Sequence, residues 1–153
     1  MTTSVKLSTP KFQQNIFLFG LINCAVYGGV LVIFRQFHTR ILPSLLVLIN
    51  CVVLWLISTI QIKRLVKKFG VMKFLRSFSL VFFTGVCAFI LFGGFIFSYS
   101  MLDRGLVNQL TRADEQLLTS VILIVSEGAG GSMIVALICM FYADQFYDHE
   151  KKA

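Results

Sequence analysis

One acidic side chain, Glu127, lies inside a long apolar run of the sequence, between Val125-Ser126 and Gly128-Ala129-Gly130-Gly131. A charged side chain at the centre of a bilayer costs on the order of 3 kcal/mol on insertion scales, so a carboxyl there requires a partner. Asn23 and Asn50 lie at similar depth in two other apolar runs. We therefore expect Glu127, Asn23 and Asn50 to form a polar cluster inside a helical bundle. Such a cluster either hydrogen-bonds the helices together or serves as a proton relay.

No other residue pattern in the sequence indicates catalysis. It contains no glycine-rich phosphate loop, HExxH motif, Ser/His/Asp order or paired carboxylates. His38 and His149 are expected on opposite sides of the membrane, where they cannot share a metal ion. The four cysteines lie in separate apolar runs without CxxC spacing, so we expect small packing residues rather than disulfides or zinc ligands. The sequence predicts no enzyme, no cofactor and no metal site.

The elements that must position these groups are apolar segments of membrane-spanning length. Of the 153 residues, 57% are hydrophobic and 14% are charged, whereas soluble domains are about 25% charged. A helix needs about 20 apolar residues to cross a bilayer. Four runs qualify, at about 16–34, 41–62, 77–99 and 118–142. The prediction is an all-α polytopic membrane protein, a single membrane domain over residues 1–153 with four transmembrane helices.

Basic residues orient these four predicted helices. Alternate connecting segments hold ten Lys and Arg residues against four, which places both termini and the loop 63–76 in the cytoplasm and the loop 100–117 outside. The loop 63–76 is expected to bind an anionic cytoplasmic leaflet, and a soluble partner is the alternative. Nucleic acid is not expected, because no soluble domain is present to carry it. The six basic residues of this loop are Lys63, Arg64, Lys67, Lys68, Lys73 and Arg76.

Small residues recur every four positions in the first and fourth predicted helices. Each set lies on one helix face and permits close approach of a neighbouring backbone. Either the first helix packs against the fourth within the chain, or these faces bind a partner protein. The two sets are Gly20, Cys24 and Gly28, and Gly128, Ser132 and Ala136.

The middle third of the chain resembles a known family. The quoted stretches are Ile62-Lys-Arg-Leu, Lys73-Phe-Leu-Arg-Ser-Phe-Ser-Leu and Phe97-Ser-Tyr-Ser-Met-Leu-Asp103. They resemble domain of unknown function 4199, a family of four-helix membrane proteins of Bacteroidetes in which a basic cytoplasmic loop enters a long third helix. Arg104 stands where that pattern has a proline. The resemblance implies a bacterial inner (cytoplasmic) membrane and assigns no activity.

These observations favour a small non-catalytic membrane subunit or assembly factor that packs against other membrane subunits or itself. The alternative is a proton- or ion-coupled transporter protomer that uses Glu127. A lipid-modifying enzyme would need polar residues gathered at one membrane surface, and the polar residues of this sequence are too scattered.

Overall fold

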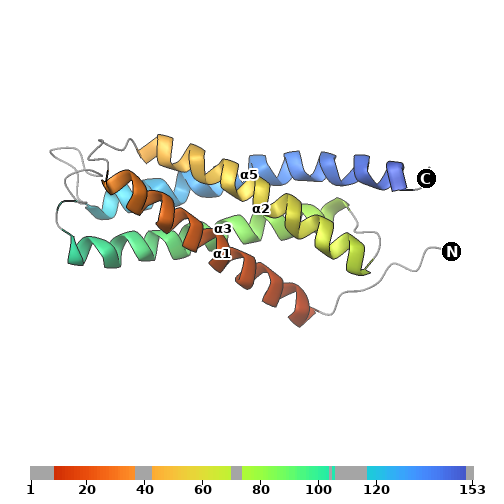
Figure 1. The fold of residues 1–153 in the computed structure, drawn as a ribbon, viewed down its shortest axis with the longest axis horizontal. Helices are drawn as coiled ribbons and strands as arrows, with labels where there is room; N and C mark the ends of the chain where they lie inside the picture. The colour runs from red at the N-terminus through yellow and green to blue at the C-terminus, as the bar shows by residue number, and fades with distance from the viewer. Residues whose placement is uncertain (1–8, 37–42, 70–73, 104, 106–116, 151–153) are drawn as a thin grey trace.

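The chain folds into four long antiparallel helices, shown in Figure 1. The structure is a computed structural model, and it describes residues 9–36, 43–69, 74–103, 105 and 117–150. The helices are α1 (Thr9–Gln36), α2 (Pro43–Phe69), α3 (Phe74–Leu102) and α5 (Leu117–Glu150). The start of α1 and the end of α5 lie at the same end of the bundle (Figure 1). The all-helical prediction is confirmed.

Each helix extends beyond the apolar run that predicted it. Pro43 opens α2, where its missing amide proton costs no hydrogen bond. Both ends of the predicted basic loop 63–76 are helical, because α2 continues to Phe69 and α3 begins at Phe74. The added turns are amphipathic: Ile62 and Leu65 are buried, whereas Lys63, Arg64 and Lys67 are exposed. Ser100 to Leu102, predicted as the start of the loop 100–117, belong to α3.

Helix α3 is the centre of the bundle. It packs extensively against α5 on one side and α1 on the other, while α2 packs against α5 and, less closely, against α1. The pair α1 and α5 is not among the helices that pack substantially. The expectation that the first helix packs against the fourth is therefore wrong. Figure 1 shows α1 diverging from the other helices toward its N-terminal end.

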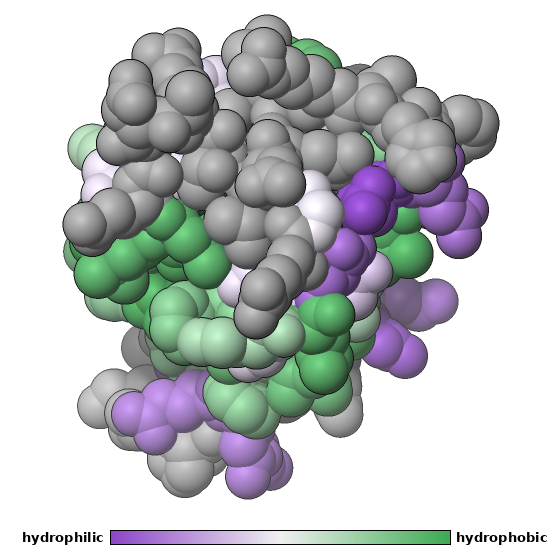
Figure 2. Space-filling model, turned by 90° about the vertical axis from the view of Figure 1, so that its left-hand side faces the viewer, coloured by the Kyte–Doolittle hydropathy of each residue, from purple (hydrophilic) through white to green (hydrophobic). Residues whose placement is uncertain are grey.

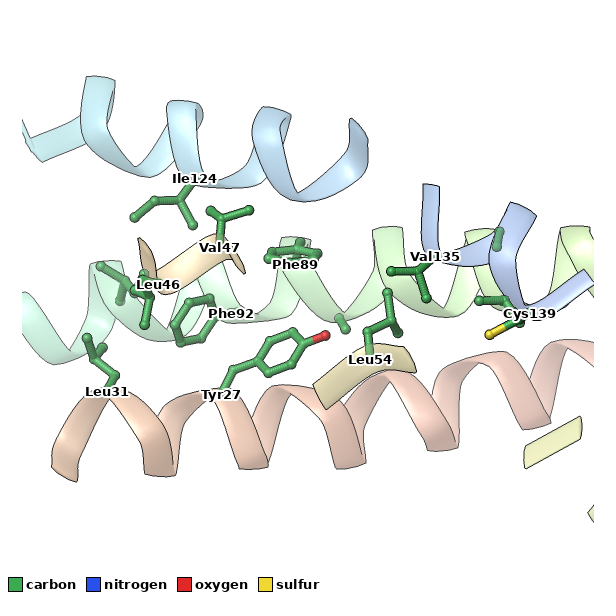
Figure 3. Packing of buried hydrophobic residues seen from close by; sticks show 14 of the residues in the cluster. Tyr27, Leu31, Leu46, Val47, Leu54, Phe89, Phe92, Ile124, Val135 and Cys139 are labelled. Atoms are coloured by element: carbon green, nitrogen blue, oxygen red, sulfur yellow. The ribbon is translucent and has the colours of Figure 1, made fainter. Parts of the chain in front are cut away.

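The hydrophobic core runs along the bundle axis and draws on all four helices. Tyr27 of α1 is fully buried, with its ring centroid 5.2 Å from Phe89 and 5.6 Å from Phe92 of α3. Figure 3 shows the Tyr27 hydroxyl pointing toward Leu54 of α2. Its ring thus separates Leu31 and Leu46 from Leu54 along the bundle (Figure 3).

The outer surface of the bundle is also apolar. Many large hydrophobic side chains are exposed, including Leu48 at 63%, Ile90 at 57% and Ile134 at 62%. Figure 2, a view onto one end of the bundle, shows apolar side chains reaching the flanks. A helix that is apolar on both its inner and outer faces is typical of a membrane span. All four helices are long and apolar enough to cross a membrane, over Lys11–Gln36, Ser44–Lys67, Leu75–Leu102 and Leu117–Phe141.

Candidate functional site

The structure separates the three residues of the predicted polar cluster. Asn23 and Asn50 are fully buried in the interior, but Glu127 is exposed on the outer face of α5. The expectation that Glu127 lies inside the bundle is wrong. The reason is the rotation of α5 about its axis: Ile124 and Gly128 face inward, and Glu127 is turned about 100° from Gly128. Depth along a helix does not determine which face a residue occupies.

Glu127 is isolated in an apolar part of the surface. It is the one charged residue within the four predicted runs, and its neighbours on the outer face of α5 are Leu123, Ser126, Gly130 and Ile134, all exposed. The Ser126 hydroxyl donates to the Leu123 carbonyl at 2.9 Å, within its own helix. Among the described residues, no side chain forms a hydrogen bond or ion pair with the Glu127 carboxyl. The carboxyl thus lacks a partner within the described chain.

Asn23 of α1 and Asn50 of α2 lie beside residues that pack against neighbouring helices. Cys51, next to Asn50, lies against Gly131 of α5, and Gly128 lies one turn away against Phe89. Asn23 is one turn from Gly20, which contacts Cys87 and Thr84 of α3. The Asn23 amide donates to the Phe19 carbonyl at 2.8 Å. Asn23 and Asn50 are thus both buried in the interior, and Glu127 is not.

Several further interior polar groups were missed by the sequence interpretation. Ser58 and Gln61 of α2 and Thr84 of α3 are fully buried, as is Tyr27. Their side-chain polar atoms, with both polar atoms of Asn50 and the Asn23 Oδ1 atom, have no hydrogen-bond partner among the described residues. The spacing of Asn50, Ser58 and Gln61 on one face of α2 was a usable signal, because positions three, four, seven or eight apart share a helix face.

Both small-residue faces pack inside the chain, and each packs on α3. A Cβ on Gly20 would lie 3.0 Å from Cys87 Sγ, and one on Gly28 would lie 3.2 Å from the Phe95 ring. In α5, Gly128 meets Phe89 and Ser132 meets Gly85. Ser132 donates to the Gly128 carbonyl at 2.8 Å, and Ala136 is fully buried. Cys24 is half-buried and packs against the core.

An ion pair joins α1 to Asp103, the residue that follows α3, at the end of the bundle that is opposite Thr9. Arg35 Nε donates to Asp103 Oδ2 at 2.9 Å, and a second guanidinium nitrogen lies 3.4 Å from Oδ1. The Gly105 amide also donates to Asp103 Oδ1, at 2.9 Å. The sequence interpretation placed both charged residues in separate connecting segments and did not pair them. Their common membrane side was the signal available, since both segments were predicted to lie outside.

Positive charges gather at the other end, which we call the basic end and define by Lys63, Arg64 and Lys67 of α2. All three side chains are exposed. The Arg76 guanidinium lies 5.5 Å from the Phe12 ring centroid, a cation–π contact between the first turns of α3 and α1. Lys68 belongs to α2, and Lys73 lies outside the described residues.

The described residues offer no obvious metal or disulfide chemistry. All four cysteines carry free thiols. No group of three His, Cys, Asp or Glu side chains with metal-binding geometry occurs within residues 9–36, 43–69, 74–103, 105 and 117–150. His38 lies outside the described residues.

Four long helices with apolar inner and outer faces place the chain among the multi-pass α-helical membrane proteins. No protein family model, no curated protein and no solved structure matches the chain. The resemblance of its middle third to domain of unknown function 4199 therefore stays a prediction.

Proposed function

We propose that this protein is a small non-catalytic subunit or assembly factor that docks on another membrane protein through the outer face of α5. One observation carries the proposal, namely the exposed position of Glu127 without a partner in the described chain. Leaving a carboxyl in contact with lipid costs on the order of 3 kcal/mol, and a binding partner that satisfies it removes this cost. The face that needs a partner is therefore the face that Glu127 occupies.

The shape of this face supports a helix as the occupant. Ser126 and Gly130, four residues apart, are exposed beside Glu127, and no atom lies within 4 Å of a Cβ built on Gly130. Small residues at this spacing let a second transmembrane helix approach closely. Helix α5 is also the least enclosed of the four spans. Of its apolar membrane-spanning part, 28% is buried inside the bundle, against 50% for α3.

Charge complementarity defines the partner's chemistry. A Lys, Arg or His side chain, or an amide donor, at the middle of a partner helix would satisfy Glu127 by a charge-assisted hydrogen bond. A second copy of this chain would instead bring two carboxyls together, and neither would supply the basic or amide donor that the other lacks. We therefore favour a different protein with a basic or amide residue at that depth.

The proposed setting is a bacterial inner membrane with the basic end in the cytoplasm. Lys63, Arg64 and Lys67 support this orientation, since each exposed basic residue near an anionic leaflet contributes about 1 kcal/mol. With four spans, both termini then lie in the cytoplasm. Topology reporters fused to the N- or C-terminus test this assignment.

Site-specific photo-crosslinking in the native membrane tests the docking face. A photoreactive residue at Gly130 is expected to crosslink to one other membrane protein, and the same residue at Gly94, on the open face of α3, is not. The Gly130 crosslink should be lost in the Glu127→Leu variant and recovered in part by Glu127→Gln, which keeps a hydrogen-bonding group. Crosslinks only to a second copy of this chain would make the protein a homo-oligomer. Equal crosslinking from both positions, or none from either, would refute the proposal.

A proton- or ion-coupled transporter protomer is the second candidate function. Glu127 favours it as the one charged residue within the four predicted apolar runs, because such residues frequently mark ion pathways. Since Glu127 lies on the outer face, that pathway would run between subunits rather than through this bundle. Proton flux into liposomes that is abolished by Glu127→Gln supports the transporter. Unchanged flux rules it out.

A further inference from the structure

Helices α2 and α5 pack against each other and run in the same direction along the bundle (Figure 1). Two contacts set their register. A Cβ built on Gly131 of α5 would meet the Cys51 sulfur of α2, and the Cys139 thiol of α5 lies within hydrogen-bonding reach of Thr59 of α2. The two contacts are separated by eight residues in each helix. Each residue of α2 therefore lies level with the residue of α5 whose number is 80 higher.

Glu127 lies beside this helix pair rather than far from it. It precedes Gly131 by four residues, so it is turned only about 40° from the direction in which α5 contacts α2. On α2, Leu48 precedes Cys51 by three residues and is turned about 60° from the direction of α5. By the register of the two helices, Leu48 and Glu127 lie within about one residue of the same level.

Leu48 and Glu127 lie on the outer side of the contact between α2 and α5. The inner side is filled by the core, because Val47 of α2 and Ile124 of α5 are buried there (Figure 3). Leu48 and Glu127 are both exposed, as is Ile134, which follows Gly131 by three residues. We call this outer strip the α2–α5 seam and define it by Leu48, Glu127 and Ile134. The carboxyl thus lies at the junction of two helices.

The depth of Glu127 restricts what can reach it. It lies two residues from the midpoint of the span Leu117–Phe141, which is a rise of about 3 Å. Lipid headgroups lie about 15 Å from the middle of a bilayer whose hydrocarbon is about 30 Å thick. A phospholipid therefore does not bring its polar atoms to this carboxyl. A transmembrane helix with a polar side chain near its centre does.

We propose that a transmembrane helix of the partner binds along the α2–α5 seam and places a Lys or Arg side chain at the level of Glu127. This inference rests on the docking function proposed above, and it names the surface and the partner's residue. A cation gives the carboxylate hydrogen bonds and an opposite charge together, whereas an amide gives hydrogen bonds alone. A basic residue is itself costly within a membrane span, so pairing relieves both proteins.

The seam also gives a partner helix more apolar contact than α5 alone. Leu48 contributes from α2 and Ile134 from α5, and both side chains are more than half exposed in this bundle. Gly130 is turned about 60° from Glu127, so it lies at the edge of the same contact and permits close approach there. A helix in the seam therefore touches two helices of this chain.

Photo-crosslinking in the native membrane distinguishes the seam from a face centred on α5 alone. A photoreactive residue at Leu48 is expected to crosslink to the same protein as one at Gly130. Ile60 is the matched control on α2, because it is 61% exposed, against 63% for Leu48, and is turned about 120° from it. The Ile60 crosslink should be at least several-fold weaker. On α5, Ile134 should crosslink, whereas Met133, turned about 120° from Glu127, should not.

The crosslinking pattern separates failure of the seam from failure of the docking function. Crosslinks from Gly130 and Met133 without one from Leu48 would place the partner on α5 alone, so the seam would be overturned while the docking function would stand. Absence of crosslinks from both Gly130 and Leu48 would overturn both. A Leu48 crosslink that leads only to a second copy of this chain would overturn the basic partner.

Synthetic peptides test the charge of the partner with the full chain in liposomes. The probe is a leucine-rich transmembrane peptide with one Lys at its centre, and energy transfer to the labelled protein measures association. We expect this peptide to associate at least several-fold more strongly than matched peptides with Gln or Leu at that place. The advantage should disappear in the Glu127→Leu variant, which replaces an exposed side chain. Equal association of the three peptides, or an unchanged advantage in Glu127→Leu, would overturn the proposal.

Discussion

Replacing Gly128 with alanine adds a methyl group where the Phe89 ring lies, and we expect this change to destabilise the bundle. A Cβ at position 128 would meet three ring atoms of Phe89, Cδ1, Cγ and Cε1, inside normal contact distance. The ring has little room to move, since Phe89 is fully buried and lies 5.2 Å from the Tyr27 ring. Overpacking costs about 1–3 kcal/mol, and alanine recovers about 1 kcal/mol in helix propensity, so the net loss is about 0–2 kcal/mol.

Gly130→Ala is the matched control, because it separates the steric cost from the propensity gain. Gly130 lies two residues away in the same helix, and a Cβ there meets nothing within 4 Å. Both variants gain the same propensity, so their free energies of unfolding should differ by about 1–3 kcal/mol, the overpacking cost alone. Reversible unfolding of the purified protein in mixed micelles measures this difference. Equal stabilities, within about 0.5 kcal/mol, would refute the packing of Gly128 against Phe89.

Further tests address the ion pair, the α3–α5 contact and the exposed carboxyl. A double-mutant cycle of Arg35→Ala and Asp103→Ala should give a small favourable coupling that weakens in high salt, because the pair is partly exposed. A coupling insensitive to salt would contradict this geometry. Gly93→Ala should cost about 1–3 kcal/mol of overpacking against a Val125 methyl group, which would lie 2.7 Å from the new Cβ, while Gly94→Ala should cost nothing by comparison. Glu127→Leu should improve the apparent insertion free energy of α5 by on the order of 3 kcal/mol in a glycosylation-based insertion assay.

The four helices could be predicted from the sequence because each apolar run is long enough to cross a bilayer and the runs are separated by polar residues. The ends of these helices could not be predicted in the same way. Lys63, Arg64 and Lys67 were assigned to a loop by their charge, yet the intervening Leu65 turns inward and lets α2 continue. A charged segment with apolar residues at helical spacing continues a helix when its apolar side can still pack.

The burial of two candidate residues could be predicted from the sequence, but the outward direction of the third could not. Asn23 and Asn50 proved to be interior, whereas Glu127 proved to be exterior. The sequence contained the information for this distinction, because Gly128, Ser132 and Ala136 mark the packed face of α5 and Glu127 is about 100° away from that face. The helix that contacts the packed face of α5 could not be predicted, because small residues permit close approach of any neighbouring helix.

Contacts with α3 explain why the small-residue faces of α1 and α5 both pack inside the bundle. It carries its own small residues at the contacts, Gly85 against Ser132 and Gly93 against Val125, so α5 approaches it closely along much of its length. With its inner face occupied in this way, α5 has one open face left, and that face holds Glu127. A carboxyl on the packed face would have been explained by contacts within the bundle. Its position on the open face, beside the small residues Ser126 and Gly130, supports the proposal that a second membrane helix binds there.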